Sequence, residues 1–166
     1  MKTRTIVSPI GALTLTEEAG QITGLRFGGA PGANDVSPLL DEAEAQLQAY
    51  FAGVRTTFDL PLAPKGTPFQ RAVWDALRAI PFGETRTYAQ IAAAVGNPKA
   101  CRAVGMANNR NPIAILIPCH RVIGANGSLT GYAGGLAVKK ALMASGKFIP
   151  WSVVTISTDG RIIDRA

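Results

Sequence analysis

The sequence predicts an α/β protein, with a small N-terminal antiparallel sheet-plus-helix domain followed by a mainly helical C-terminal domain with a helix-turn-helix. Residues 3–28 alternate apolar and polar side chains around a Ser-Pro-Ile-Gly turn, which indicates short antiparallel strands. Residues 37–51 repeat apolar side chains at helical spacing. After residue 66, helix-start motifs recur, which favours helices for most of the second half.

The first domain is expected to end in the stretch 61–66, which contains proline and glycine. A short strand, Thr57–Leu60, is expected just before it. Because proline and glycine interrupt helices and strands, we place the domain boundary here. The predicted domains are residues 1–63 and residues 64–166.

Two capping boxes predict helix starts in the second domain. Thr67 with Gln70 predicts a helix that stops at Pro81, and Thr87 with Gln90 predicts another. The other expected elements are a second helix of the helix-turn-helix over 99–108, a buried apolar run over 113–117, a helix over 136–145, and a terminal hairpin made of 151–157 and 161–164.

Charge and hydropathy narrow the class of protein. The net charge is +6 and the pI about 9.8, which favours a polyanionic partner such as nucleic acid, although a solvated basic face gives the same signal. No apolar run approaches the roughly 18 residues of a membrane span, and the first residues do not resemble a secretory signal. We therefore expect a cytoplasmic protein without membrane contact.

Cys119 is the candidate nucleophile. It precedes His120, the one histidine of the chain, and a neighbouring imidazole can help to form the reactive thiolate. Adjacent residues usually point apart, so a water-mediated relation between them is the better expectation. The alternative is a small buried cysteine beside a hydrogen-bonded histidine. One histidine and no paired cysteines argue against a zinc site, so no metal is expected.

The sequence around Cys119 resembles a known family. The segments TPFQRAVWDALRAIPFGETRTYAQIAAAVGNPKA (67–100), RAVGMANNRNPIAIL (102–116), IPCHRVIG (117–124) and GSLTGYAGGLAVKKAL (127–142) resemble the methylated-DNA–protein-cysteine methyltransferases, also called 6-O-alkylguanine-DNA alkyltransferases. The resemblance is close over residues 67–142. It implies direct-reversal DNA repair, in which the alkyl group of 6-O-methylguanine moves once to the protein's own Cys119.

The resemblance also implies roles for individual residues. Cys119 would attack the alkyl carbon, and His120 would deprotonate it through water. Tyr88 would donate a proton or hydrogen bond to the departing guanine and contact DNA, and Asn111 would orient the acceptor turn. DNA contacts are implied for Arg102, Asn97 and Gln70, with Arg102 filling the gap left by a flipped nucleotide. The guanine pocket is implied to include Tyr132, Ala133, Gly134 and Val122, with 124–128 at its rim.

One position departs from the family pattern. Members place a glutamate near the end of the last conserved helix, where it hydrogen-bonds the active histidine, and Gly146 stands at that position here. The tail after it also differs from the family ending. Asp159 or Asp164 could substitute for the missing carboxylate. Its loss is expected to affect the rate of transfer more than the reaction itself.

Three other functions stay open at this point. A damage sensor would bind alkylguanine without accepting the group, although such sensors lack the cysteine that Cys119 supplies. A transcriptional regulator would use the helix-turn-helix alone, and a cysteine hydrolase would need a third triad member that is not evident.

The expected partner is double-stranded DNA containing alkylated guanine, bound in the minor groove through residues 99–108. We expect no cofactor, and a monomer in solution.

Overall fold

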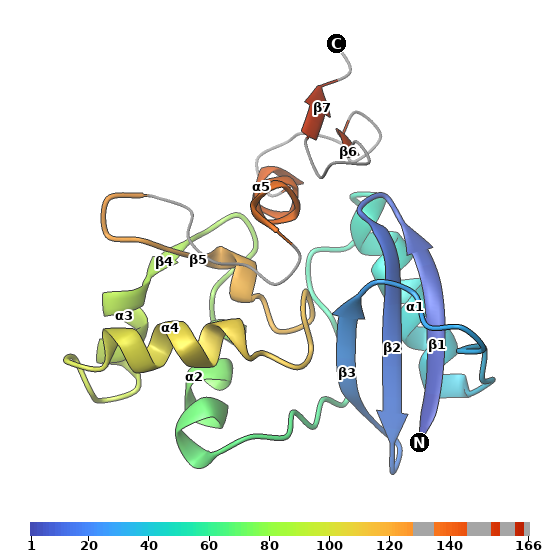
Figure 1. Cartoon of the computed structure of the whole chain (residues 1–166), viewed down its shortest axis with the longest axis horizontal. Coiled ribbons are helices and arrows are strands. Elements are labelled where there is room, and N and C mark those ends of the chain that lie inside the picture. The colour runs from blue at the N-terminus through green and yellow to red at the C-terminus, as the bar shows by residue number, and fades with distance from the viewer. Residues whose placement is uncertain (128–134, 146–153, 157–161, 165–166) are drawn as a thin grey trace.

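The computed structural model describes residues 1–127, 135–145, 154–156 and 162–164, and it confirms the predicted α/β class (Figure 1). Three strands, β1 (Lys2–Ser8), β2 (Gly11–Glu18) and β3 (Gln21–Phe27), form an antiparallel sheet in the order β1-β2-β3. Helix α1 (Pro38–Phe51) lies against one face of this sheet. No helix in the described part of the chain has the length and hydropathy needed to cross a membrane.

Apolar side chains hold α1 on the sheet. Leu13 and Leu15 of β2 and Leu40 and Leu47 of α1 are fully buried in the same core. Burying each such side chain stabilises the folded state by about 1.5–3 kcal/mol relative to exposure. Ser37 accepts a hydrogen bond from the Leu40 amide and so begins the helix.

The second half of the chain is mainly helical. Its elements are α2 (Pro68–Arg78), β4 (Arg86–Thr87), α3 (Tyr88–Ala94), α4 (Cys101–Asn109), the 3-10 helix η1 (Cys119–Arg121), β5 (Val122–Ile123), α5 (Leu136–Ser145), β6 (Val154–Ile156) and β7 (Ile162–Asp164). Both predicted capping boxes are present, at Thr67 with Gln70 and at Thr87 with Gln90. Strands β6 and β7 pair antiparallel, as the predicted terminal hairpin requires.

Two predictions of local structure need correction. Residues 57–60 do not form a strand, because the Gln46 side chain bonds both the amide and the carbonyl of Asp59, at 2.9 and 3.0 Å. Helix α4 begins at Cys101 rather than at Lys99, because the preceding residues close a turn in which the Ala100 amide donates to the Asn97 carbonyl. The parallel pair β4–β5 was not predicted.

The outer edge of β3 holds the segment that leads to Cys119. The Leu25 amide donates to the Pro112 carbonyl, and the Ala114 amide donates to the Leu25 carbonyl, both at 3.0 Å. Farther along the same edge, Ile22 bonds residues 61 and 63. The N-terminal sheet therefore fixes the start of the acceptor loop through backbone hydrogen bonds.

Candidate active site and nucleic-acid interface

Two tight turns shape the backbone before Cys119. The Leu116 amide donates to the Ala114 carbonyl at 2.8 Å around Ile115, whose φ is 70°. The Cys119 amide donates to the Ile117 carbonyl at 2.8 Å around Pro118. The first is a γ-turn of the rarer, strained hand, which costs on the order of 1–3 kcal/mol for a β-branched residue. The buried side chains of residues 113–117 hold this strained loop in place.

Asn108 and Asn111 fix the carbonyl groups of the acceptor loop. The Asn111 side chain donates to the Ile117 carbonyl at 2.8 Å and accepts from the Ile113 amide at 3.0 Å. Asn108, which is buried in α4, donates to the Cys119 carbonyl at 3.3 Å. The first pair of bonds is the kind of contact expected of Asn111. Asn108 was not singled out from the sequence.

Cys119 and His120 lie side by side in the buried interior. Their exposed fractions are 4% and 1%. Among the described residues, His120 Nδ1 has no hydrogen-bond partner. Burial lowers the pKa of His120 well below 6.5, and the positive charges of Arg121 and Lys139 lower it further. The imidazole is therefore neutral at neutral pH and can accept a proton.

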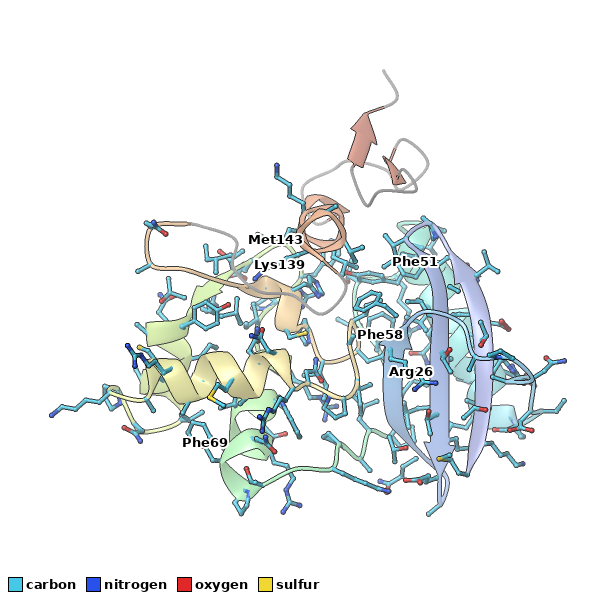
Figure 2. All side chains as sticks on the ribbon, in the orientation of Figure 1. Arg26, Phe51, Phe58, Phe69, Lys139 and Met143 are labelled. Carbon is cyan, nitrogen blue, oxygen red and sulfur yellow. The ribbon has the colours of Figure 1, made fainter. Side chains whose placement is uncertain are left out.

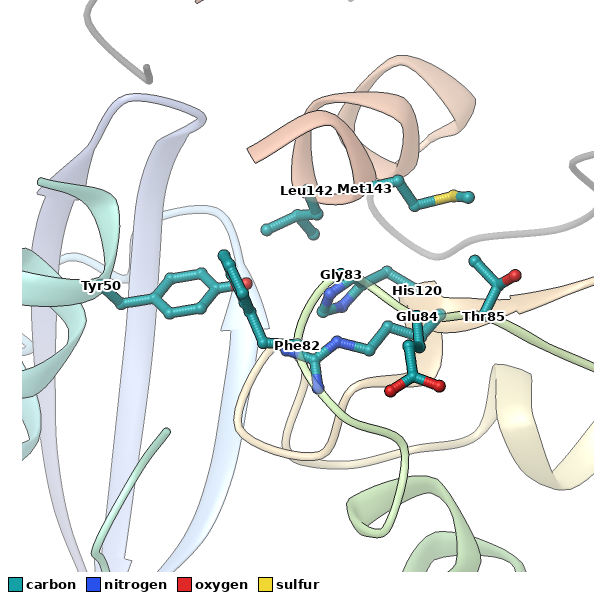
Figure 3. Close-up of a pocket in the computed structure, with 9 residues that line it drawn as sticks. Tyr50, Phe82, Gly83, Glu84, Thr85, His120, Leu142 and Met143 are labelled. Atoms are coloured by element: carbon teal, nitrogen blue, oxygen red, sulfur yellow. The ribbon is translucent and has the colours of Figure 1, made fainter. Parts of the chain in front are cut away.

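A small cavity borders His120 on the side of the N-terminal domain (Figure 3). Its volume is about 10 Å³, which is about the room that one water needs. Tyr50 of α1 and Phe82 face it from one side, and Leu142 and Met143 of α5 cover it from another. The tyrosine and phenylalanine rings meet edge to face, with centroids 5.8 Å apart. Packing of α1 and α5 thus keeps His120 out of bulk solvent.

Lys139 places a positive charge in the same region. Its side chain is fully buried on α5, and Nζ donates to the Val122 carbonyl at 2.6 Å (Figure 2). Burial lowers the pKa of Lys139, while the charge of Cys119 acts in the opposite direction. An ammonium near the sulfur stabilises a thiolate. Lys139 was not singled out from the sequence. The sequence feature that could have identified it is its position on the same buried face of α5 as Val138 and Leu142.

The parallel pair β4–β5 brings two predicted site residues toward Cys119. Thr87, just before Tyr88, pairs with Ile123, and Arg86 pairs with Val122. Val122 is fully buried and follows η1 directly. Half-buried Tyr88 begins α3 and lies against Gly105, where an added Cβ would be 3.9 Å from the ring. The pairing therefore places Tyr88, which follows β4, close to the acceptor segment that contains Val122.

Three predicted DNA contacts lie outside this interior. Arg102 is exposed in the first turn of α4, and Asn97 is exposed in the turn between α3 and α4. Gln70 is half-buried, and its side-chain oxygen accepts from the Thr67 amide at 3.0 Å. The predicted residues Tyr132, Ala133, Gly134 and Gly146 lie outside the described residues.

A helix-turn-helix whose second helix exposes Arg102, beside a buried cysteine, histidine and lysine, defines a nucleic-acid-binding protein with a nucleophilic thiol. Residues 68–147 match the family described as 6-O-methylguanine DNA methyltransferase, DNA binding domain. Residues 1–64 match 6-O-methylguanine DNA methyltransferase, ribonuclease-like domain. The chain belongs to the 6-O-methylguanine DNA methyltransferase family.

Individual relatives agree with this assignment. The constitutive methylated-DNA–protein-cysteine methyltransferase of Bacillus subtilis is 52% identical over 149 residues, which cover 84% of this chain and 90% of that protein. The corresponding protein of Methanosarcina acetivorans is 68% identical over 102 residues, 61% of this chain and 65% of that protein. The structure of Mycobacterium tuberculosis OGT in complex with DNA has a TM-score of 0.83 and 48% identity, and covers 92% of this chain and 98% of that chain.

Proposed function

We propose that this protein repairs alkylated DNA by moving the alkyl group of 6-O-methylguanine to Sγ of Cys119, once per molecule. The observation that carries the proposal is the buried group of Cys119, neutral His120 and Lys139 beside a DNA-binding fold. Residues 1–63 would support the acceptor loop, and residues 64–166 would bind DNA and accept the alkyl group.

The chemical step is a single displacement. Proton transfer from the Cys119 thiol, through water, to the neutral His120 imidazole would form the thiolate. The sulfur then attacks the alkyl carbon, so an S–C bond forms while the bond between carbon and the guanine oxygen breaks. The guanine leaves with the electron pair of that bond, with Tyr88 as its hydrogen-bond donor. It takes up one proton from solvent, and His120 returns the proton of the Cys119 thiol to solvent, so the protons balance. Because the thioether is stable, the protein is consumed.

Buried charge explains why this thiol would react. A thiolate is the nucleophilic form of cysteine, and the low dielectric of the interior strengthens its attraction to the Lys139 ammonium. Asn108 and Asn111 hold the backbone around the sulfur, so little reorganisation is needed during attack. Arg102, exposed on α4, would occupy the duplex position from which the damaged nucleotide is extruded.

A titration of duplex against protein tests the proposal. Duplex carrying a single 6-O-methylguanine is incubated with rising amounts of protein, and the remaining lesion is counted by chromatography of the nucleosides. One lesion should disappear for each active molecule, and the Cys119→Ser variant should remove none. Lesion-selective binding without loss of the lesion would instead identify a damage sensor.

A further inference from the structure

Met106 is an exposed apolar residue in the middle of α4. Its exposed fraction is 57%. The other large apolar side chains that are exposed in the described part of the chain, Met1, Val7, Val36 and Val54, all belong to the N-terminal half. Single exposed apolar residues are common on protein surfaces, so the role of Met106 depends on which residues surround it on this helix.

The exposed face of α4 places Met106 between two arginines. Arg102, Met106 and Arg110 are spaced four residues apart, so they lie along one side of the helix, and all three are exposed. The opposite face is buried through Val104, Ala107 and Asn108. The outward face thus consists of an apolar side chain between two guanidinium groups.

The charge on this face selects the partner. Residues 97–112 contain Lys99, Arg102 and Arg110 and no aspartate or glutamate. Such a face attracts phosphate groups, whereas a protein partner with an apolar groove gains little from it. Sugar rings and base edges in a duplex groove supply the apolar contact that Met106 would make between phosphates. Minor-groove proteins place apolar side chains against DNA in a comparable way.

We propose that Met106 packs against the sugars and base edges of the minor groove, one helical turn beyond Arg102, and sets the affinity for duplex DNA through apolar contact. The inference rests on the proposed function, because it takes α4 as the element that enters the DNA. Met106 would bind through apolar contact, whereas Arg102 and Arg110 would bind through their charge. The side chain would read no base and would bind damaged and undamaged duplex alike.

Binding of labelled undamaged duplex, followed by fluorescence anisotropy over a range of salt concentrations, tests this role. Met106→Gln and Met106→Ala should weaken binding about five- to tenfold, as expected for losing most of one buried side chain. Met106→Leu should stay within about twofold of the unaltered protein, since it keeps the apolar volume. The dependence of log affinity on log salt should keep its slope in all three, because no charge is removed.

The matched control is Val54→Gln, which removes another exposed apolar side chain, this one from the N-terminal half, and should leave binding unchanged. Thermal melting of each variant shows that the fold is intact. Equal affinity of Met106→Gln and the unaltered protein overturns the inference, and so does an equal loss in the Leu and Gln variants. Failure of the unaltered protein to bind duplex at all overturns the proposed function instead.

Discussion

The side-chain amide of Asn108 donates a hydrogen bond to the carbonyl of Cys119 at 3.3 Å, which ties the end of α4 to the acceptor residue. The same helix carries exposed Arg102 in its first turn. The proposed DNA-contacting element and the nucleophile are thus joined by one rigid helix. The hydrogen bond thus links the position of α4 to the backbone of Cys119.

Asn108→Ala should slow transfer and weaken the fold. The change leaves the buried Cys119 carbonyl without this donor and opens a small void, which together cost about 1–3 kcal/mol. Urea unfolding measures the stability loss, and single-turnover transfer from a methylated duplex measures the rate, expected to fall about tenfold. The exposed neighbour Asn109, changed to alanine, is the control. Similar loss in both variants would contradict a specific role for the Asn108 bond.

Lys139→Met should separate stability from activity. Relief of the desolvation cost of the buried ammonium opposes the loss of its hydrogen bond to the Val122 carbonyl, so the free energy of unfolding should change by no more than about 1–3 kcal/mol. Transfer should nevertheless slow by about 10- to 100-fold, since the thiolate loses its nearby positive charge. The neighbouring exposed residue, as Lys140→Met, should have little effect on either. A fast, stable Lys139→Met protein would remove the lysine from the proposed site.

The stability of the protein should depend on pH through His120. In the unfolded chain the imidazole takes up a proton near its ordinary pKa of about 6.5, but burial lowers its pKa well below that in the folded chain. Lowering the pH from about 6.5 to 5 should therefore reduce the free energy of unfolding, by at most about 1.4 kcal/mol per pH unit.

Urea denaturation at several pH values measures this dependence. The chain has one histidine, so no other imidazole contributes between pH 5 and 6.5. His120→Asn should flatten the curve in this window and leave the fall at lower pH that comes from Glu18, whose pKa the hydrogen bond to Lys65 lowers. If the free energy of unfolding of His120→Asn depends on pH between 5 and 6.5 as steeply as that of the unaltered protein, the lowered pKa of His120 is not the cause of the dependence.

Arg102→Ala should weaken duplex binding in a salt-dependent way. If the guanidinium acts beside phosphates, the slope of log affinity against log salt should fall by about 0.9. Anisotropy titrations at several salt concentrations provide the slope. Arg26, which is exposed on β3 in the N-terminal sheet, offers a control cation as Arg26→Ala (Figure 2). Equal slopes for the Arg102 and Arg26 variants would remove Arg102 from the interface.

Local signals allowed much of the fold to be predicted from the sequence. The capping boxes at Thr67 and Thr87 each involve residues three apart, so their partners are visible in a short window. The strand expected over 57–60 failed because its backbone partner is the Gln46 side chain, a contact that no periodicity reveals. The pair β4–β5 joins residues far apart in the chain and was missed for the same reason.

The candidate site was only partly predictable. Cys119 and His120 stand in a recognisable motif, so the sequence pointed to them directly. Lys139 and Asn108 belong to helices whose pattern indicates ordinary packing, and their relation to Cys119 appears only when α4 and α5 are placed around η1. Family members carry a glutamate at the position of Gly146, and residue spacing alone could not identify another carboxylate that takes its place.

The most direct test of the central claim is the intact mass of the protein after incubation with a duplex containing one 6-O-methylguanine, followed by peptide mapping. The proposal predicts a gain of about 14 Da, one CH₂ unit, carried by the peptide with Cys119 and not by that of exposed Cys101. Cys119→Ala should show no gain. An unchanged mass for the unaltered protein, with the lesion bound and intact, would contradict transfer to Cys119.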